Sequence, residues 1–349
     1  YYTKRKEMIN NKSLMAVAGI VVVALAAGVI YQQTGNKTDK YPSRDINMVV
    51  PWNPGGSTDL TGRALADAMG KSMGTNIVVT NTPGSGGSVG SLTVQKAEKD
   101  GYNILANGML ALTAMPVLGY TETTQKDWDF YLATFTPNVL AVRKDSPYQT
   151  AQELLDAMKA NPDSITDGTG GMGSGGHLGI EVLCAETGLT YKHVPYEGGG
   201  KAITAALAGE VDFTSQLLVE MQDMFISGDM RALANFTAED ITLENGTVIP
   251  SILQFVPSLE SKLPMGETTG IAVPKGEPDY VLEALDKAFD EALKSEDFLK
   301  FCETKGFIVN GMGRQEAAAY VDKLASTVTW TLYDCGVAAI SPEEFGISR

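Results

Sequence analysis

The chain has 349 residues, of which 44% are apolar and 20% are charged, a composition typical of one large or two ordinary globular domains. Its formal net charge of −15 argues against nucleic acid as a partner. Two histidines, and three cysteines without CxxC spacing, argue against a metal site, and we expect neither metal nor cofactor.

The first 40 residues differ from the rest of the chain. A stretch with four Lys or Arg side chains precedes an uncharged apolar run, residues 14–31, which a polar tether follows. This pattern predicts an export signal or a single membrane anchor, so we expect an exported protein that meets the membrane through this segment only. Whether the segment is cleaved near Ala26 or retained stays open, as does a start at Met8 rather than Tyr1.

From Tyr41 onward, short β-branched runs alternate with helical patterns. The predicted strands are Ile46–Val50, Asn76–Thr80, Tyr102–Ala106, Val139–Val142, Ile165–Gly168, Tyr191–Val194, Val211–Phe213, Arg231–Ala234 and Gly270–Val273. The predicted helices are Leu60–Met73, Val89–Lys96, Ala151–Ala160, Leu178–Thr187 and Ala202–Ala208, followed by 278–294, 296–305 and 314–334. This order predicts an α/β fold with mostly parallel sheets covered by helices on both faces.

The strands are too numerous for one small sheet, and residues 143–147 divide the glycine-rich turns into two sets. We interpret this stretch as a first crossing between two lobes and place a second crossing near 263–270. The prediction is a two-lobe clamshell: a signal or anchor with tether over 1–40, lobe 1 over 41–142 and 264–349, and lobe 2 over 143–263.

Three predicted strands end in glycine-rich turns that open into helices, at residues 52–59, 84–90 and 170–177, and residues 193–201 repeat the pattern. Such turns leave backbone N–H groups free at a helix N-terminus, where anions bind. The candidate ligand-binding residues are Trp52, Asn53, Gly55, Gly56, Ser57, Thr58, Asp59, Ser85, Gly86, Gly87, Ser88, Asn107, Gly173, Ser174, His177, Tyr196, Gly198 and Gly199.

Three of these candidates have competing interpretations. His177 either donates to an anion or packs at the start of its helix. Asp59 either orders its loop, which we favour, or contacts an amine or hydroxyl of the ligand. Trp52 either forms a wall of the cleft or is simply buried.

Other motifs in the chain fail on inspection. Gly84–Gly90 misses the GxGxxG dinucleotide fingerprint because Val89 stands where the third glycine belongs. Ser88 matches GxSxG, but several loop residues separate it from its strand, unlike a nucleophile elbow. We therefore expect no catalytic residues. Cys302 and Cys335 either form a disulfide or are packed thiols, and both interpretations stay open.

Five segments together resemble the substrate-binding proteins of tripartite tricarboxylate transporters, also called Bug-type receptors. They are Val49–Asp59, Val78–Gly87, Asp100–Tyr102, His193–Gly199 and Ala208–Asp212. The resemblance implies a periplasmic-binding-protein clamshell of type II that closes on a small organic carboxylate, held mainly by backbone N–H groups. It also implies delivery to the large and small membrane subunits of such a transporter. Asn53-Pro54 departs from the small residues expected in the first loop.

Two other functions remain alternatives at this point. An exported sensory module would use the same clamshell and a retained N-terminal helix. An enzyme on this scaffold is less favoured, because the sequence offers no convincing combination of nucleophile, base and orienting group.

Overall fold

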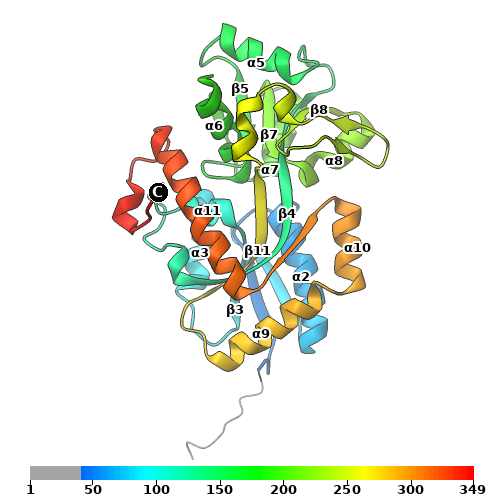
Figure 1. The fold of residues 1–349 in the computed structure, drawn as a ribbon. Coiled ribbons are helices and arrows are strands. Elements are labelled where there is room, and N and C mark those ends of the chain that lie inside the picture. Colours follow the sequence, from blue (N-terminus) through cyan, green and yellow to red (C-terminus); the bar gives the residue numbers. More distant parts are fainter. Residues whose placement is uncertain (1–40) are drawn as a thin grey trace, which may run out of the picture. The chain divides into compact units, whose positions relative to one another are not determined.

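The computed structural model describes residues 41–349, so the predicted signal or anchor lies outside the described residues. Strands and helices alternate along the chain (Figure 1). The strands are β1 (Ile46–Val50), β2 (Ile77–Asn81), β3 (Asn103–Gly108), β4 (Trp128–Arg143), β5 (Thr166–Thr169), β6 (Lys192–Pro195), β7 (Phe213–Leu217), β8 (Met230–Asn235), β9 (Ile241–Thr242), β10 (Val248–Ile249), β11 (Gly266–Pro274) and β12 (Ile308–Met312).

The helices follow the strands and cover them. They are α2 (Ser57–Met73), α3 (Ser88–Gln95), α4 (Met109–Ala114), α5 (Ala151–Ala160), α6 (Gly175–Thr187), α7 (Gly199–Ala208), α8 (Leu218–Ser227), α9 (Asp279–Ala292), α10 (Glu296–Lys305) and α11 (Arg314–Asp334). Short 3₁₀ turns lie at Ser85–Gly87, Gln125–Asp127, Ile252–Gln254, Pro257–Lys262 and Pro342–Phe345.

Within the described residues, one sheet of ten strands connects two lobes. In lobe 1 the strands β2, β1 and β3 are parallel, and in lobe 2 the strands β6, β5 and β7 are parallel. Between these groups lie β11 and β4, which pair antiparallel and run from one lobe to the other (Figure 1). The fold is thus the α/β two-lobe clamshell that the strand and helix pattern predicts.

Strand β4 is much longer than the predicted Val139–Val142. Its first half is also apolar, with Trp128, Phe130 and Leu132 nearly inaccessible to solvent, and it continues the sheet of lobe 1 before entering that of lobe 2. Because β4 belongs to both lobes, the division at residues 142 and 263 stays a prediction.

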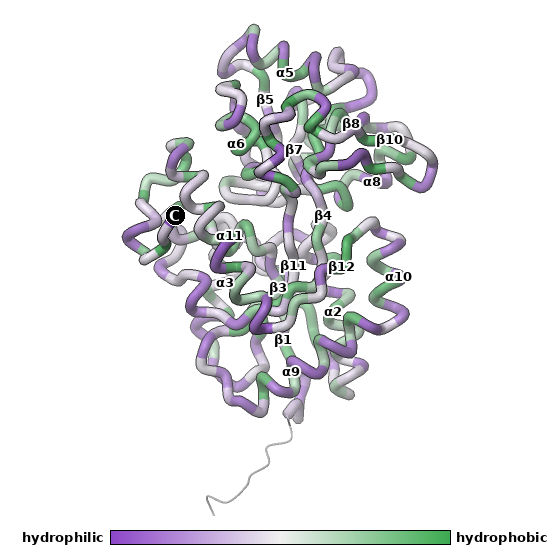
Figure 2. The backbone as a smooth tube through the Cα atoms, viewed as in Figure 1, coloured by the Kyte–Doolittle hydropathy of each residue, from purple (hydrophilic) through white to green (hydrophobic). Residues whose placement is uncertain are grey.

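The core follows the two-residue period of the strands. Leu140 and Val142 pack beneath α5 and α6 on one face of β4, whereas Val139 and Ala141 pack beneath α7 and α8 on the other. Hydrophobic residues accordingly follow the strands, while hydrophilic residues mark the outer turns of the helices (Figure 2). Leu178 of α6 packs against residues of α4 and α11, so the lobes also touch through an apolar contact.

The structure also bears on the predicted membrane segment and on the cysteines. No helix within residues 41–349 combines the length and the apolar content needed to cross a membrane. Cys184, Cys302 and Cys335 are all free thiols, so the structure contains no disulfide between Cys302 and Cys335.

Candidate functional site

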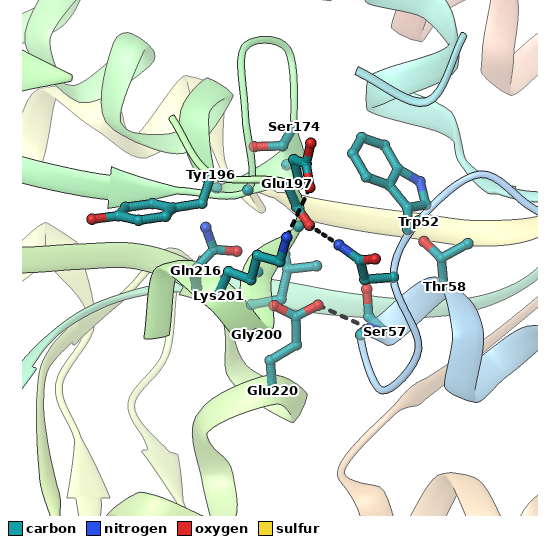
Figure 3. A pocket seen from close by; sticks show the side chains of 18 of the residues that line it. Trp52, Ser57, Thr58, Ser174, Tyr196, Glu197, Gly200, Lys201, Gln216 and Glu220 are labelled. Atoms are coloured by element: carbon teal, nitrogen blue, oxygen red, sulfur yellow. Dashed lines mark hydrogen bonds and ion pairs between the residues drawn. The ribbon is translucent and has the colours of Figure 1, made fainter. Parts of the chain in front are cut away.

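Three helices, α2 from lobe 1 and α6 and α7 from lobe 2, begin at one cavity of about 470 Å³ between the lobes (Figure 3). We call it the interlobe cavity. Its lining consists of Trp52, Asn53, Pro54, Gly56, Ser57, Thr58, Ala111, Gly170, Ser174, Gly175, Gly176, Tyr196, Glu197, Gly198, Gly199, Gly200, Lys201, Thr204, Ala205, Glu210, Gln216, Leu217, Glu220 and Glu267. The first N–H groups of a helix have no acceptor within that helix. Three such groups of donors therefore meet at one space.

Nine of the predicted residues belong to this lining. They are Trp52, Asn53, Gly56, Ser57, Thr58, Ser174, Tyr196, Gly198 and Gly199. They come from the first, third and fourth glycine-rich segments, which the folded sheet brings together at the carboxyl ends of its strands.

The first loop is fixed from behind by side chains that do not line the cavity. Trp52 Nε1 donates to Asn107 Oδ1 at 2.8 Å, and Asn81 donates to the carbonyl oxygen of Trp52 at 3.0 Å. Asn107 is inaccessible to solvent. It therefore positions Trp52 as a wall of the cavity rather than lining the cavity itself.

Asp59 lies inside the loop, next to Gly55, and is also absent from the lining. Its carboxylate accepts hydrogen bonds from the Gly55 N–H at 2.9 Å, from Arg63 at 3.0 Å and from Asn81 at 2.8 Å. Burial raises the pKa of Asp59, but the hydrogen bonds from Arg63, Asn81 and Gly55 outweigh it, and the net pKa is lowered. These contacts are those of a residue that orders the loop.

The second loop, with Ser85, Gly86, Gly87 and Ser88, packs behind Trp52 and outside the lining. A Cβ on Gly87 would lie 3.1 Å from the indole Cζ2, and Ser88 is buried at the start of α3. This loop thus supports the indole. The structure does not bring its N–H groups into the lining.

The third loop is held by the two histidines. Ser174 caps α6 by accepting from the His177 N–H, and the Gly173 N–H donates to His177 Nδ1 at 3.2 Å. His177 Nε2 faces Glu181 at 3.4 Å, and its ring lies on that of His193, 4.3 Å between centroids. Burial, and then the neighbouring His177, lower the pKa of His193 to about 4. His177 therefore supports the loop from behind and lies outside the cavity lining.

The Asn53 side chain of the first loop makes a contact that crosses between the lobes. The Asn53 side-chain amide donates to the carbonyl oxygen of Glu197, and Lys201 pairs with the Glu197 carboxylate at 2.8 Å (Figure 3). Because Asn53 replaces the small residue expected in this loop, this bridge depends on that departure.

Sequence reasoning missed three polar side chains of the cavity, those of Glu220, Glu267 and Gln216. Glu220, in the first turn of α8, accepts from the Ser57 N–H at 2.9 Å across the lobes, and Glu267 of β11 accepts from the Leu110 N–H at 3.0 Å. Gln216 is 3% exposed and Glu267 is 4% exposed. Burial raises the pKa of both carboxyl groups, that of Glu267 to about 8.

A weak signal for these residues exists in the sequence. Glu267 is the acidic residue of a strand that is otherwise apolar or hydroxylated, and Glu220 follows the apolar run Leu217–Val219. An acid in such a run is expensive to bury without a partner. The sequence therefore indicates that each of these acids has a partner, but it does not indicate that the partner is the start of a helix.

The groups around the cavity are arranged for binding. Within residues 41–349, no three His, Cys, Asp or Glu side chains form a group able to hold a metal ion. Backbone donors, an indole wall and a few polar side chains around one cavity are typical of a small-molecule binding site.

Comparison with known proteins identifies the family. Residues 61–328 match the family model described as tripartite tricarboxylate transporter family receptor. The UPF0065 protein from the tcbD–tcbE intergenic region of Pseudomonas sp. strain P51 is 31% identical over 318 residues, 87% of this chain and 91% of that protein.

Two solved structures share the fold over most of the chain. The periplasmic binding protein BugD is 28% identical with a TM-score of 0.77, covering 85% of this chain and 99% of its own. Rpa4515 of R. palustris, solved with adipate, is 25% identical with a TM-score of 0.76 and the same coverage. The chain therefore belongs to the tripartite tricarboxylate transporter receptor family and is a substrate-binding receptor, not an enzyme.

Proposed function

We propose that this chain is an exported receptor whose lobes close on a small organic carboxylate in the interlobe cavity. The receptor then delivers the acid to the large and small membrane subunits of a tripartite tricarboxylate-type transporter. The observation that carries the proposal is the convergence of α2, α6 and α7 on one cavity. Rpa4515, which was solved with adipate, supports a carboxylate as the ligand.

The energetics favour several helix starts acting together. One helix N-terminus stabilises an anion by about 0.3–1 kcal/mol when exposed and by up to about 2 kcal/mol when partly buried. Three helix starts together with charge-assisted hydrogen bonds approach the binding free energy of a micromolar ligand, about −8 kcal/mol. Only the closed form presents the donors of both lobes to one ligand, so binding favours closure.

The proposed ligand contacts are the predicted residues that line the cavity: Trp52, Asn53, Gly56, Ser57, Thr58, Ser174, Tyr196, Gly198 and Gly199. Asp59, Asn107, His177 and the second loop are proposed to position them.

A thermal-shift screen with matched acids and amides tests the proposal. Mono-, di- and tricarboxylates, adipate included, are compared with the corresponding amides, which keep the shape but lack the charge. An acid at 100 times its Kd stabilises the folded state by about 2.7 kcal/mol, which raises the Tm of a chain of this size by roughly 4 °C. If no acid raises Tm above its amide, the carboxylate receptor is refuted. Uptake of the selected acid by cells with and without the membrane subunits tests the delivery step.

A further inference from the structure

A carboxylate of the protein already lies where two helices begin. Glu220 Oε1 accepts from the Ser57 N–H at the start of α2. Glu220 Oε2 lies at the start of α7, since a Cβ on Gly199 would be 1.9 Å from it. Oε2 is shielded from solvent and has no hydrogen-bond partner among the described residues. One acceptor in the cavity lining is therefore unused.

The neighbouring Gln216 has a side-chain donor that lacks an acceptor. Its side chain is 3% exposed and lines the cavity, and its Nε2 has no partner among residues 41–349. Gln216 Oε1 lies 2.8 Å from the same Gly199 Cβ position that Glu220 Oε2 approaches. Gln216 Nε2 instead lies 2.7 Å from the position of a Cβ on Gly176, at the start of α6. Buried polar groups in folded proteins are nearly always paired. This unused donor and the unused acceptor of Glu220 together indicate a ligand that offers both partners.

The charged side chains around Glu220 also favour a ligand that carries a hydrogen-bond donor. Among the described lining residues the basic side chain is Lys201, and its ammonium group already pairs with Glu197 at 2.8 Å. A plain acid would bring a second negative group toward Glu220 without any compensating cation, which is unfavourable. A hydroxyl or ammonium group on the ligand would instead donate to Glu220 Oε2, and a charged donor makes the stronger hydrogen bond.

We infer that Glu220 is a specificity-determining residue, and that it selects carboxylates whose carbon skeleton also bears a hydrogen-bond donor, a hydroxyl or an ammonium group. The inference rests on the proposed function, because the carboxylate of the same ligand occupies the donors of Gln216 and of the starts of α6 and α7. Glu220 Oε2 holds the donor group, and Gln216 Nε2 holds an oxygen of the acid.

Calorimetric titration of matched acids tests this assignment on the full chain. Each set shares one skeleton and differs at carbon 2: propionate, lactate and alanine; succinate, malate and aspartate; glutarate, 2-hydroxyglutarate and glutamate. We expect a hydroxyl or amino acid of one skeleton to bind wild type at least about tenfold more tightly than the plain acid. Comparing the affinities of the hydroxy acid and the amino acid then identifies whether Glu220 binds a hydroxyl or an ammonium group.

The variant Glu220→Gln keeps an acceptor for the Ser57 N–H but places an NH₂ group where Oε2 stood. We expect it to reduce the preference for the donor-bearing acid over the plain acid to within about threefold. The control is Asp223→Asn, which removes the same charge one turn along α8 from a side chain that is 80% exposed. It should leave the preference intact.

Each alternative outcome has one meaning. Equal binding of plain and donor-bearing acids by wild type overturns the inference, whatever the variant does, but leaves the carboxylate receptor standing. Preference for a plain acid that Glu220→Gln abolishes also overturns it, because Glu220 would then act as a neutral donor. If no acid binds wild type, the proposed function itself fails.

Discussion

The start of α6 is held so closely against the sheet that one added methyl group should displace it. A Cβ on Gly176 would lie 2.1 Å from the main-chain oxygen of Ser215, about 1 Å closer than real contacts allow. Ser215 lies within β7, its N–H bonded to Asp167 at 2.9 Å and its hydroxyl to the Gly176 carbonyl oxygen at 2.9 Å. The strand is therefore fixed, and α6 must move.

Gly200 is the matched control for this change. It lies near the start of α7, and a Cβ there would meet nothing within 4 Å. Overpacking costs typically about 1–3 kcal/mol, and alanine regains about 0.5–1 kcal/mol over glycine in a helix. Gly176→Ala should therefore lower the free energy of unfolding by a net of about 1–2 kcal/mol, whereas Gly200→Ala should raise it slightly.

Urea unfolding at pH 7.5 measures both variants, and titration with the acid from the screen measures binding. Displacing α6 moves the N–H groups at the cavity, so we expect affinity to fall about tenfold or more in Gly176→Ala. If the two alanine variants unfold at the same urea concentration, the close approach of α6 to β7 is not as described and the reasoning is refuted.

Two pH-dependent predictions follow from buried carboxyl groups. Because the pKa of Asp59 is lowered in the folded state, its stabilisation is present above its ordinary pKa of 3.8 and is lost as pH falls through the folded value. Asp59→Ala should lower the free energy of unfolding by about 2–3 kcal/mol at pH 7, and the variant should lose less stability than wild type as the pH falls. Urea unfolding of both proteins from pH 7 to 3 measures this. Equal losses of stability in the two proteins would contradict the prediction. The pKa of Glu267 is raised from 4.5 to about 8, so wild-type stability should fall as pH rises from 4.5 to 8, by at most about 5 kcal/mol. Glu267→Gln should flatten that decline, and an unchanged slope in the variant would count against a neutral Glu267.

The sequence predicted the turns because their signals are local. A β-branched run, a glycine-rich turn and an amphipathic helix follow one another within fewer than thirty residues, as in Ile46–Met73. The carboxyl ends of neighbouring strands then bring such turns together. Trp52 and Ser174 are therefore found in the lining from local pattern alone.

The second loop shows what local pattern cannot decide. Its glycines match the other turns, yet the loop packs behind Trp52, with Gly87 against the indole. Glu220 and Glu267 are the opposite case, because no motif surrounds them and only the tertiary structure places each beside a helix start. Which turn faces the ligand, and which acid faces the turn, depends on packing between elements distant in sequence.

A crystal structure of the full chain with the acid that gives the largest thermal shift tests the central claim most directly. We predict that the ligand lies in the interlobe cavity, with its carboxylate oxygens within hydrogen-bonding distance of backbone N–H groups at the starts of α6 or α7. A ligand bound elsewhere would contradict the account. So would a ligand in the cavity whose carboxylate is held by side chains alone while those N–H groups remain unused.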